Sequence, residues 1–155
     1  MGHGTTFKVY WPLTESQESR LSDRETDLAP GGHETILVCE DKDSVRRLTV
    51  LQLRDAGYSV IEAENGDQAM RLAAEADGSV DLLVTDVIMP YMDGQTLSRE
   101  LGESHSDLKT LYVSGYTAHA IARHGVLEQG FDFIEKPFSR MKLLARVRQI
   151  LDSAG

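Results

Sequence analysis

The chain has 155 residues, of which 41% are hydrophobic, so it can fold one domain with a sizeable core beside a tail. Its formal net charge of -9 argues against direct binding to nucleic acid or to an anionic membrane surface. No window reaches the roughly 18 consecutive apolar residues of a membrane span, so we expect no membrane contact by this segment. A single cysteine, Cys39, excludes an internal disulfide.

The N-terminal residues 1–33 differ from the rest of the chain in composition and in hydrophobic pattern. Residues 1–12 alternate apolar Phe7, Val9 and Trp11 with more polar residues, which predicts one strand that ends at a proline. A lone strand is not stable and needs a partner. Residues 13–33 are polar and close on Pro-Gly-Gly, which is typical of a linker. The N-terminus has no secretion signal, so we expect a cytoplasmic location.

From Glu34 onward, strand-like runs alternate with helical runs. We expect strands at residues 35–39, 58–62, 81–85, 110–113 and 132–134, and helices at about 43–56, 67–76, 94–101, 118–127 and 139–152. Five β/α units with short connections predict a doubly wound α/β fold, in which helices cover both faces of a parallel sheet. In such folds ligands bind beyond the carboxyl ends of the strands.

Polar residues stand at the ends of four of these strands. Glu40 and Asp41 follow the first strand, Asp86 the third, Ser114 the fourth and Lys136 the fifth. Taken singly, an acidic pair is more often a helix cap, the serine a turn residue and the lysine a surface residue. Their coincidence at one sheet edge instead favours a site, and carboxylate oxygens suit Mg²⁺.

The same residues suggest phosphoryl chemistry. Asp86 can attack a phosphoryl group to form an acyl phosphate. Lys136 offers a compact positive charge to the phosphoryl oxygens, and the Ser114 hydroxyl can donate a hydrogen bond to them. Pro137 can fix the backbone beside Lys136 through a cis bond.

Residues 34–155 resemble a response-regulator receiver domain. The motifs that carry the resemblance are Ile36–Asp41, Asp86–Gly94, Val113–Tyr116 and Phe133–Phe138, in this order along the chain. The resemblance implies a flavodoxin-like fold with strand order 2-1-3-4-5. It also implies transfer of a phosphoryl group from a phosphohistidine, borne by a histidine kinase or a histidine phosphotransfer protein, onto Asp86.

The resemblance further implies a metal site. Asp41 and Asp86 would bind Mg²⁺ directly, the Ile88 backbone carbonyl would be a third ligand, and Glu40 would act through water. The first acid of the pair is Glu40 here, where the family more commonly has Asp. A longer side chain keeps the charge but shifts the position of that contact.

The resemblance also assigns the switch. Ser114 and Lys136 would contact the phosphoryl group, and Phe133 would be the switch aromatic, three residues before the lysine. The family often has Thr at the Ser114 position, and Ser keeps the donor. A homodimer through the helix at 118–127, the strand at 132–134 and the helix at 139–152 would be consistent with this switch.

The segment Gly2–Pro12 is similar to the last glycine box and final strand of a histidine-kinase ATP-binding domain. A generic strand or a tag remnant stays open as an alternative. The resemblance implies that residues 1–12 are a remnant of such a domain, 13–33 a linker and 34–155 the receiver of a hybrid sensor kinase, whose parent protein can be membrane-anchored. The rest of the ATP site is absent, so we expect no kinase activity from this fragment.

Two other function classes remain open. An Asp-nucleophile phosphomonoesterase also uses a strand-end aspartate, Mg²⁺ and a lysine, but usually needs a second acid two residues later, where this chain has Ile88. An interaction module that has lost phosphorylation is the other. On the helix at 43–56 we expect Val45, Leu48, Leu53 and Ala56 to face inward, which leaves Val50 and Leu51 for docking onto a kinase helical bundle.

Overall fold

The computed structural model of the chain describes residues 31–76, 79–116 and 131–153. The expected strand in 1–12, all but the last residues of the expected linker, and the expected helix at 118–127 lie outside these ranges. Among the helices that are described, none combines the length and the apolarity that crossing a membrane requires.

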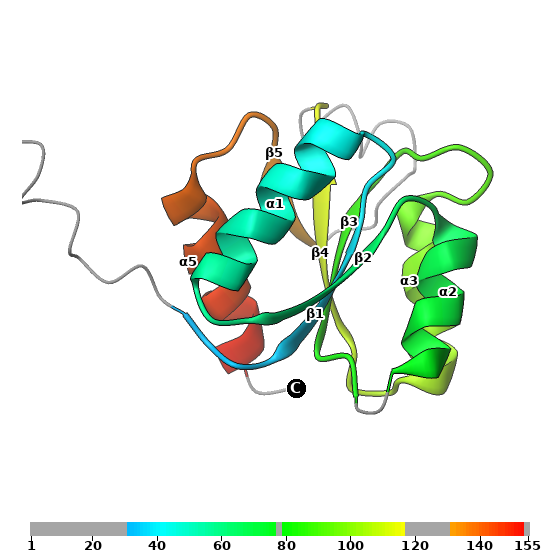
Figure 1. Ribbon diagram of the computed structural model, residues 1–155. Coiled ribbons are helices and arrows are strands. Elements are labelled where there is room, and N and C mark those ends of the chain that lie inside the picture. The colour runs from blue at the N-terminus through cyan, green and yellow to red at the C-terminus, as the bar shows by residue number, and fades with distance from the viewer. Residues whose placement is uncertain (1–30, 77–78, 117–130, 154–155) are drawn as a thin grey trace, which may run out of the picture.

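Five parallel strands form one sheet in the order β2-β1-β3-β4-β5, which confirms the predicted topology (Figure 1). The strands are β1 (Thr35–Cys39), β2 (Ser59–Ala63), β3 (Leu82–Asp86), β4 (Lys109–Ser114) and β5 (Asp132–Glu135). Every residue of the central strand β3 is buried, as expected for a parallel sheet that is covered on both faces.

Two layers of helices cover the sheet. Figure 1 shows α1 and α5 on one face and α2 and α3 on the other. The described helices are α1 (Asp43–Asp55), α2 (Gly66–Glu75), α3 (Gly94–Ser104) and α5 (Arg140–Asp152). Polar side chains begin three of them: Asn65, Asp93 and Ser139 each accept a hydrogen bond from a backbone N–H in the first turn.

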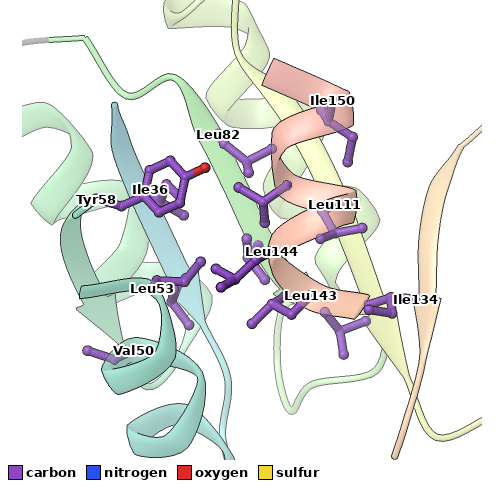
Figure 2. Close-up of a cluster of buried hydrophobic side chains, with 14 residues drawn as sticks. Ile36, Val50, Leu53, Tyr58, Leu82, Leu111, Ile134, Leu143, Leu144 and Ile150 are labelled. Carbon is purple, nitrogen blue, oxygen red and sulfur yellow. The ribbon is translucent and has the colours of Figure 1, made fainter. Parts of the chain in front are cut away.

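Each face of the sheet has its own apolar core. The core under α1 and α5 gathers side chains from both helices and from strands β1, β3, β4 and β5 (Figure 2). Within it, Leu143 and Leu144 of α5 are fully buried. Burial of a leucine side chain stabilises a fold by about 1.5–3 kcal/mol, so this face anchors α5 firmly against the sheet.

The inward face of α1 differs from the prediction. Thr49, Val50 and Leu53 are buried, whereas Leu48 is 56% exposed. Our assignment of Leu48 as inward and Val50 as outward was therefore wrong. The buried positions follow the i, i+1, i+4 spacing of one helical face, and Leu48 lies about 100° around the helix from Thr49. Leu51 is 57% exposed, as predicted.

The end of α5 is held by a lysine from the sheet. The Lys109 ammonium, at the start of β4, donates hydrogen bonds to the carbonyl oxygens of Ile150 at 3.0 Å, Leu151 at 3.1 Å and Ser153. Helices leave their last carbonyls without partners, and a cation there is favourable. Lys109 therefore ties α5 to the edge of the sheet opposite the strand ends.

Candidate functional site

The strand register brings the predicted polar residues to one edge. Cys39 of β1 pairs with Thr85 of β3, so Glu40 and Asp86, which follow them, lie at the same level. Ser114 ends β4 opposite Glu135 of β5, and the next residue is Lys136. Parallel pairing alone is therefore enough to gather these side chains at the carboxyl edge of the sheet.

Three carboxylates converge there. One carboxylate oxygen from each of Glu40, Asp41 and Asp86 lies within 4.8 Å of the others. Glu40 and Asp86 are buried, with 4% and 6% of their surfaces exposed, while Asp41 faces solvent. Hard oxygen donors at this spacing, open to water on one side, match the ligand set that Mg²⁺ prefers. The residues present therefore fit a magnesium ion.

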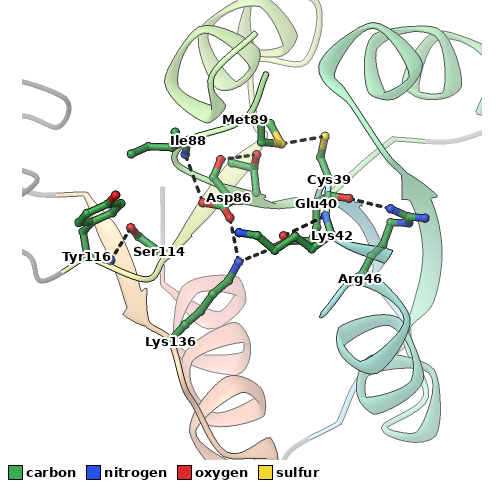
Figure 3. A network of polar contacts seen from close by, with 11 residues as sticks. Cys39, Glu40, Lys42, Arg46, Asp86, Ile88, Met89, Ser114, Tyr116 and Lys136 are labelled. Atoms are coloured by element: carbon green, nitrogen blue, oxygen red, sulfur yellow. Dashed lines mark hydrogen bonds and ion pairs between the residues drawn. The ribbon is translucent and has the colours of Figure 1, made fainter. Parts of the chain in front are cut away.

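Lys136 joins this acidic group directly. Its ammonium donates to Asp86 Oδ2 at 2.8 Å and also pairs with Glu40 Oε2 (Figure 3). The side chains of Glu40, Asp86 and Lys136 are only 6%, 7% and 17% exposed. Sequence reasoning placed Lys136 near the acids but did not predict a direct bond to Glu40, because no sequence pattern reports side-chain reach.

Burial and pairing perturb these groups in opposite senses. Burial raises the pKa of Glu40 above its ordinary value, although the hydrogen bond from Lys136 acts against this. Burial also opposes the charged form of Lys136, but the hydrogen bonds to Asp86 and Glu40 outweigh it and raise the pKa of the lysine. Lys136 is therefore firmly charged at neutral pH.

Backbone contacts orient Asp86. Its Oδ1 accepts a hydrogen bond from the Ile88 N–H at 3.2 Å, and Thr85 Oγ1 donates to its carbonyl oxygen at 3.1 Å. The first residue of α3, Gly94, donates its N–H to the Val87 carbonyl, and a Cβ at Gly94 would overlap the carbonyl oxygen of Asp86. Only glycine permits this close approach, so the motif glycine holds the loop after β3 in place.

Two residues hold Glu40, Lys42 in the β1–α1 turn and Arg46 in the first turn of α1, and sequence reasoning missed both. The Lys42 N–H donates to Glu40 Oε1 at 3.3 Å. Arg46 donates to the Glu40 carbonyl oxygen at 2.8 Å (Figure 3). It also pairs with Asp43 at 2.8 Å. The Asp43–Arg46 spacing of three residues is a signal for a helical pair, but the carbonyl contact depends on the turn geometry.

The predicted switch residues flank the site. Ser114 is buried, and its Oγ accepts a hydrogen bond from the Tyr116 N–H at 3.0 Å, which leaves the hydroxyl proton free to donate. Phe133 is half-buried and packs against Val87 and Tyr112. The Lys136–Pro137 peptide bond is cis, as the sequence suggested.

A protein-family model described as response regulator receiver domain matches residues 36–148. The chain belongs to this receiver family. The matched segment includes β2 to β5, all of β1 but its first residue, and the residues of the acidic edge.

Known relatives agree. The chain is 40% identical over 163 residues to the sensor kinase CckA of Brucella abortus, a match that covers 98% of this chain but 17% of that protein. It is 34% identical over 119 residues to the response regulator receiver protein CpdR of Brucella abortus, covering 77% of this chain and 98% of CpdR. The solved receiver domain from the hybrid histidine kinase CckA is 37% identical, with a TM-score of 0.65, over 76% of this chain and 99% of that chain.

The family defines the general role of the chain. It is a receiver domain of two-component signalling, in which phosphorylation carries the signal. Receiver domains interact with kinases or phosphotransfer proteins, and they bind Mg²⁺ in an acidic pocket. In this chain Glu40, Asp41 and Asp86 form a cluster of acidic side chains at the carboxyl edge of the sheet.

Proposed function

We propose that Asp86 accepts a phosphoryl group from a phosphohistidine of a histidine kinase or a histidine phosphotransfer protein. The observation that carries this proposal is the Asp86 carboxylate at a strand end, 2.8 Å from the Lys136 ammonium and beside two further acids. An Asp86 oxygen forms the new bond to phosphorus as the P–N bond breaks, and the electron pair of that bond stays on the imidazole nitrogen. Later attack by water on the acyl phosphate returns the free carboxylate.

In this proposal Asp41 and Asp86 bind Mg²⁺ directly, the Ile88 carbonyl is a third ligand and Glu40 contributes through water. The 4.8 Å convergence of the carboxylates and the exposure of Asp41 support this arrangement. Bound Mg²⁺ would neutralise charge on the phosphoryl oxygens. Lys136, the residue after β5, supplies the second positive charge.

On this proposal, phosphorylation of Asp86 changes the conformation of a surface of the domain. A phosphoryl group adds a charge of roughly -1.5 to -2 at neutral pH. Ser114 and Lys136 move to contact it, and Phe133, which packs against Val87 and Tyr112, changes its position. The affected surface includes β5 and α5, so it is also where a homodimer would form.

We also propose that the chain is a piece of a hybrid sensor kinase, in which 1–12 end the ATP-binding domain, 13–33 are a linker and 34–155 are the receiver. The match to the sensor kinase supports this, because it covers 98% of the chain and so includes most of its first 30 residues. On this proposal the fragment lies in the cytoplasm, has no kinase activity of its own and signals through protein contacts.

Labelling with a small phosphodonor tests the phosphoacceptor. Wild type, Asp86→Asn and a control, Asp107→Asn, are incubated with acetyl phosphate and MgCl₂ and measured by intact-protein mass spectrometry. Asp107 is exposed in the loop before β4, at the opposite edge of the sheet. We expect labelling of wild type and Asp107→Asn and none of Asp86→Asn. Labelling of Asp86→Asn to the same extent as wild type would contradict the assignment of Asp86 as the phosphoacceptor.

The same preparations separate the rival functions. Ile88, which is 54% exposed, stands where a phosphatase would need its general acid, and isoleucine has no proton to give. Turnover of a phosphomonoester by the chain would nevertheless favour the phosphatase. An absence of Mg²⁺-dependent changes in the amide NMR spectrum would favour an interaction module.

A further inference from the structure

The two buried acids of the site are already occupied by protein donors. Glu40 accepts at Oε2 from Lys136 and at Oε1 from the Lys42 N–H, and Asp86 accepts at Oδ2 from Lys136 and at Oδ1 from the Ile88 N–H. For Asp41 no hydrogen-bond partner is found within the described residues. The Lys136 ammonium therefore stands between the two buried carboxylates as their shared counter-charge (Figure 3).

The bond from Glu40 to Lys136 depends on the length of the glutamate. The backbone at Glu40 is fixed, because Arg46 holds its carbonyl oxygen at 2.8 Å and its N–H donates to the Ala63 carbonyl at 3.2 Å. From a fixed backbone, an aspartate carboxylate would stop one methylene short of the ammonium. At that separation the direct hydrogen bond is lost and only a weaker, more hydrated attraction remains.

We propose that Glu40, through its direct bond to Lys136, sets the divalent-cation affinity of this site. Glu40 holds the Lys136 ammonium over Asp86, so an incoming cation meets a positive charge that is already in place. Cation binding and release of Lys136 from Glu40 are therefore coupled, and each favours the other by the same factor. The released ammonium is then available to a phosphoryl group on Asp86. This inference rests on the proposed function.

A double-mutant cycle tests the coupling. Mg²⁺ dissociation constants are measured on the full chain by calorimetry and by amide NMR titration, for wild type, Glu40→Asp, Lys136→Met and the double variant. Glu40→Asp keeps the negative charge but shortens the side chain, so that it no longer contacts Lys136 directly. We expect this substitution to lower the Mg²⁺ dissociation constant by about three- to tenfold. In the Lys136→Met background the same substitution is expected to change the constant by less than about twofold. Glu75→Asp, at the far end of α2, is the matched control and is expected to leave it unchanged.

The Lys136 ammonium gives a readout that does not depend on Mg²⁺ affinity. In wild type without Mg²⁺, we expect a Lys136 side-chain ammonium signal in ¹H–¹⁵N NMR, because ion pairing and burial slow its proton exchange. The signal should weaken on addition of Mg²⁺, and in Glu40→Asp it should be weak from the start.

The proposal is overturned if Glu40→Asp binds Mg²⁺ no more tightly than wild type, or if the substitution tightens binding equally in the wild-type and in the Lys136→Met background. It is also overturned if the Lys136 ammonium signal changes neither on addition of Mg²⁺ nor in Glu40→Asp. If Glu40→Asp does not fold, Lys136→Met must bind Mg²⁺ more tightly than the exposed control Lys142→Met, and equal constants overturn it. Phosphodonor labelling of wild type separates the two levels. If wild type is not phosphorylated, the proposed function is wrong. If wild type is phosphorylated but the double-mutant cycle shows no coupling between Glu40 and Lys136, only this inference is wrong.

Discussion

Replacement of Lys136 by Met is expected to destabilise the fold because two buried carboxylates lose their shared counter-charge. Glu40 and Asp86 have side chains that are 6% and 7% exposed, and both pair with Lys136. Removing one partner of a buried ion pair costs about 3–5 kcal/mol. We expect the lower end, about 3 kcal/mol at neutral pH, because Lys136 itself is 17% exposed and Asp41 opens the site to water.

The measurement is urea unfolding followed by far-ultraviolet circular dichroism, in EDTA, with Lys142→Met as the control. Lys142 lies exposed in the first turn of α5, so its loss should change the free energy of unfolding by less than about 0.5 kcal/mol. Added MgCl₂ should stabilise Lys136→Met more than wild type, because the ion replaces the missing charge and binds more tightly.

The pH dependence of the effect has a definite sign. The raised pKa of Glu40 means that the folded state binds a proton there more tightly than the unfolded state does. The free energy of unfolding therefore falls as pH rises from the unfolded pKa of Glu40 through its folded pKa. Lys136 has a raised pKa, so its contribution is present below its unfolded pKa and lost as pH rises through the folded one. The cost of Lys136→Met should therefore shrink as pH falls and Glu40 takes up a proton.

Two results would refute this reasoning. Lys136→Met could prove as stable as wild type at pH 7 in EDTA, which would mean that water already screens the acids. Alternatively, MgCl₂ could stabilise both proteins equally, which would mean that the ammonium and the ion do not compete for the same carboxylates.

Three further predictions concern the framework of the fold. Gly94→Ala should destabilise the chain by about 1–3 kcal/mol in urea, because its Cβ would overlap the Asp86 carbonyl oxygen. Lys109→Met should cost about 1–2 kcal/mol and speed amide exchange in the last turn of α5, whose carbonyls lose their donor. Burial raises the pKa of Cys39 to about 12, so a disulfide reagent at pH 8 should modify it only after unfolding; rapid modification of the folded chain would contradict its burial.

Much of the fold follows from local pattern. The run Thr35–Cys39 was predicted and observed with the same bounds. Strand β3 was predicted at 81–85 and observed as Leu82–Asp86, so Asp86 ends the strand and does not follow it. Such shifts of one residue arise because hydrogen-bonded pairing with neighbours, and not the residue itself, decides where a strand stops. The inward face of α1 was misjudged because apolar side chains lie on more than one side of that helix.

The sequence by itself determined which residues reach the acidic edge. Glu40, Asp41, Asp86, Ser114 and Lys136 each end or follow a strand, and parallel strands share one carboxyl edge, so their meeting is a consequence of topology. Their carboxylate, hydroxyl and ammonium groups are of the types that suit a cation and a phosphoryl group, which is the basis of the proposed function.

Only the tertiary structure decided how those residues pair. The bond between Glu40 and Lys136 and the hydrogen bond from Arg46 to the Glu40 carbonyl join residues that no sequence pattern links. Asp86 and Gly94 share a motif, but only the structure shows how closely they approach. These contacts depend on side-chain reach, on the packing of α1 and α3 against the sheet, and on the position of β5 at its edge. Strand ends can therefore be read from periodicity, but the partner of each charge at those ends is fixed by three-dimensional distance.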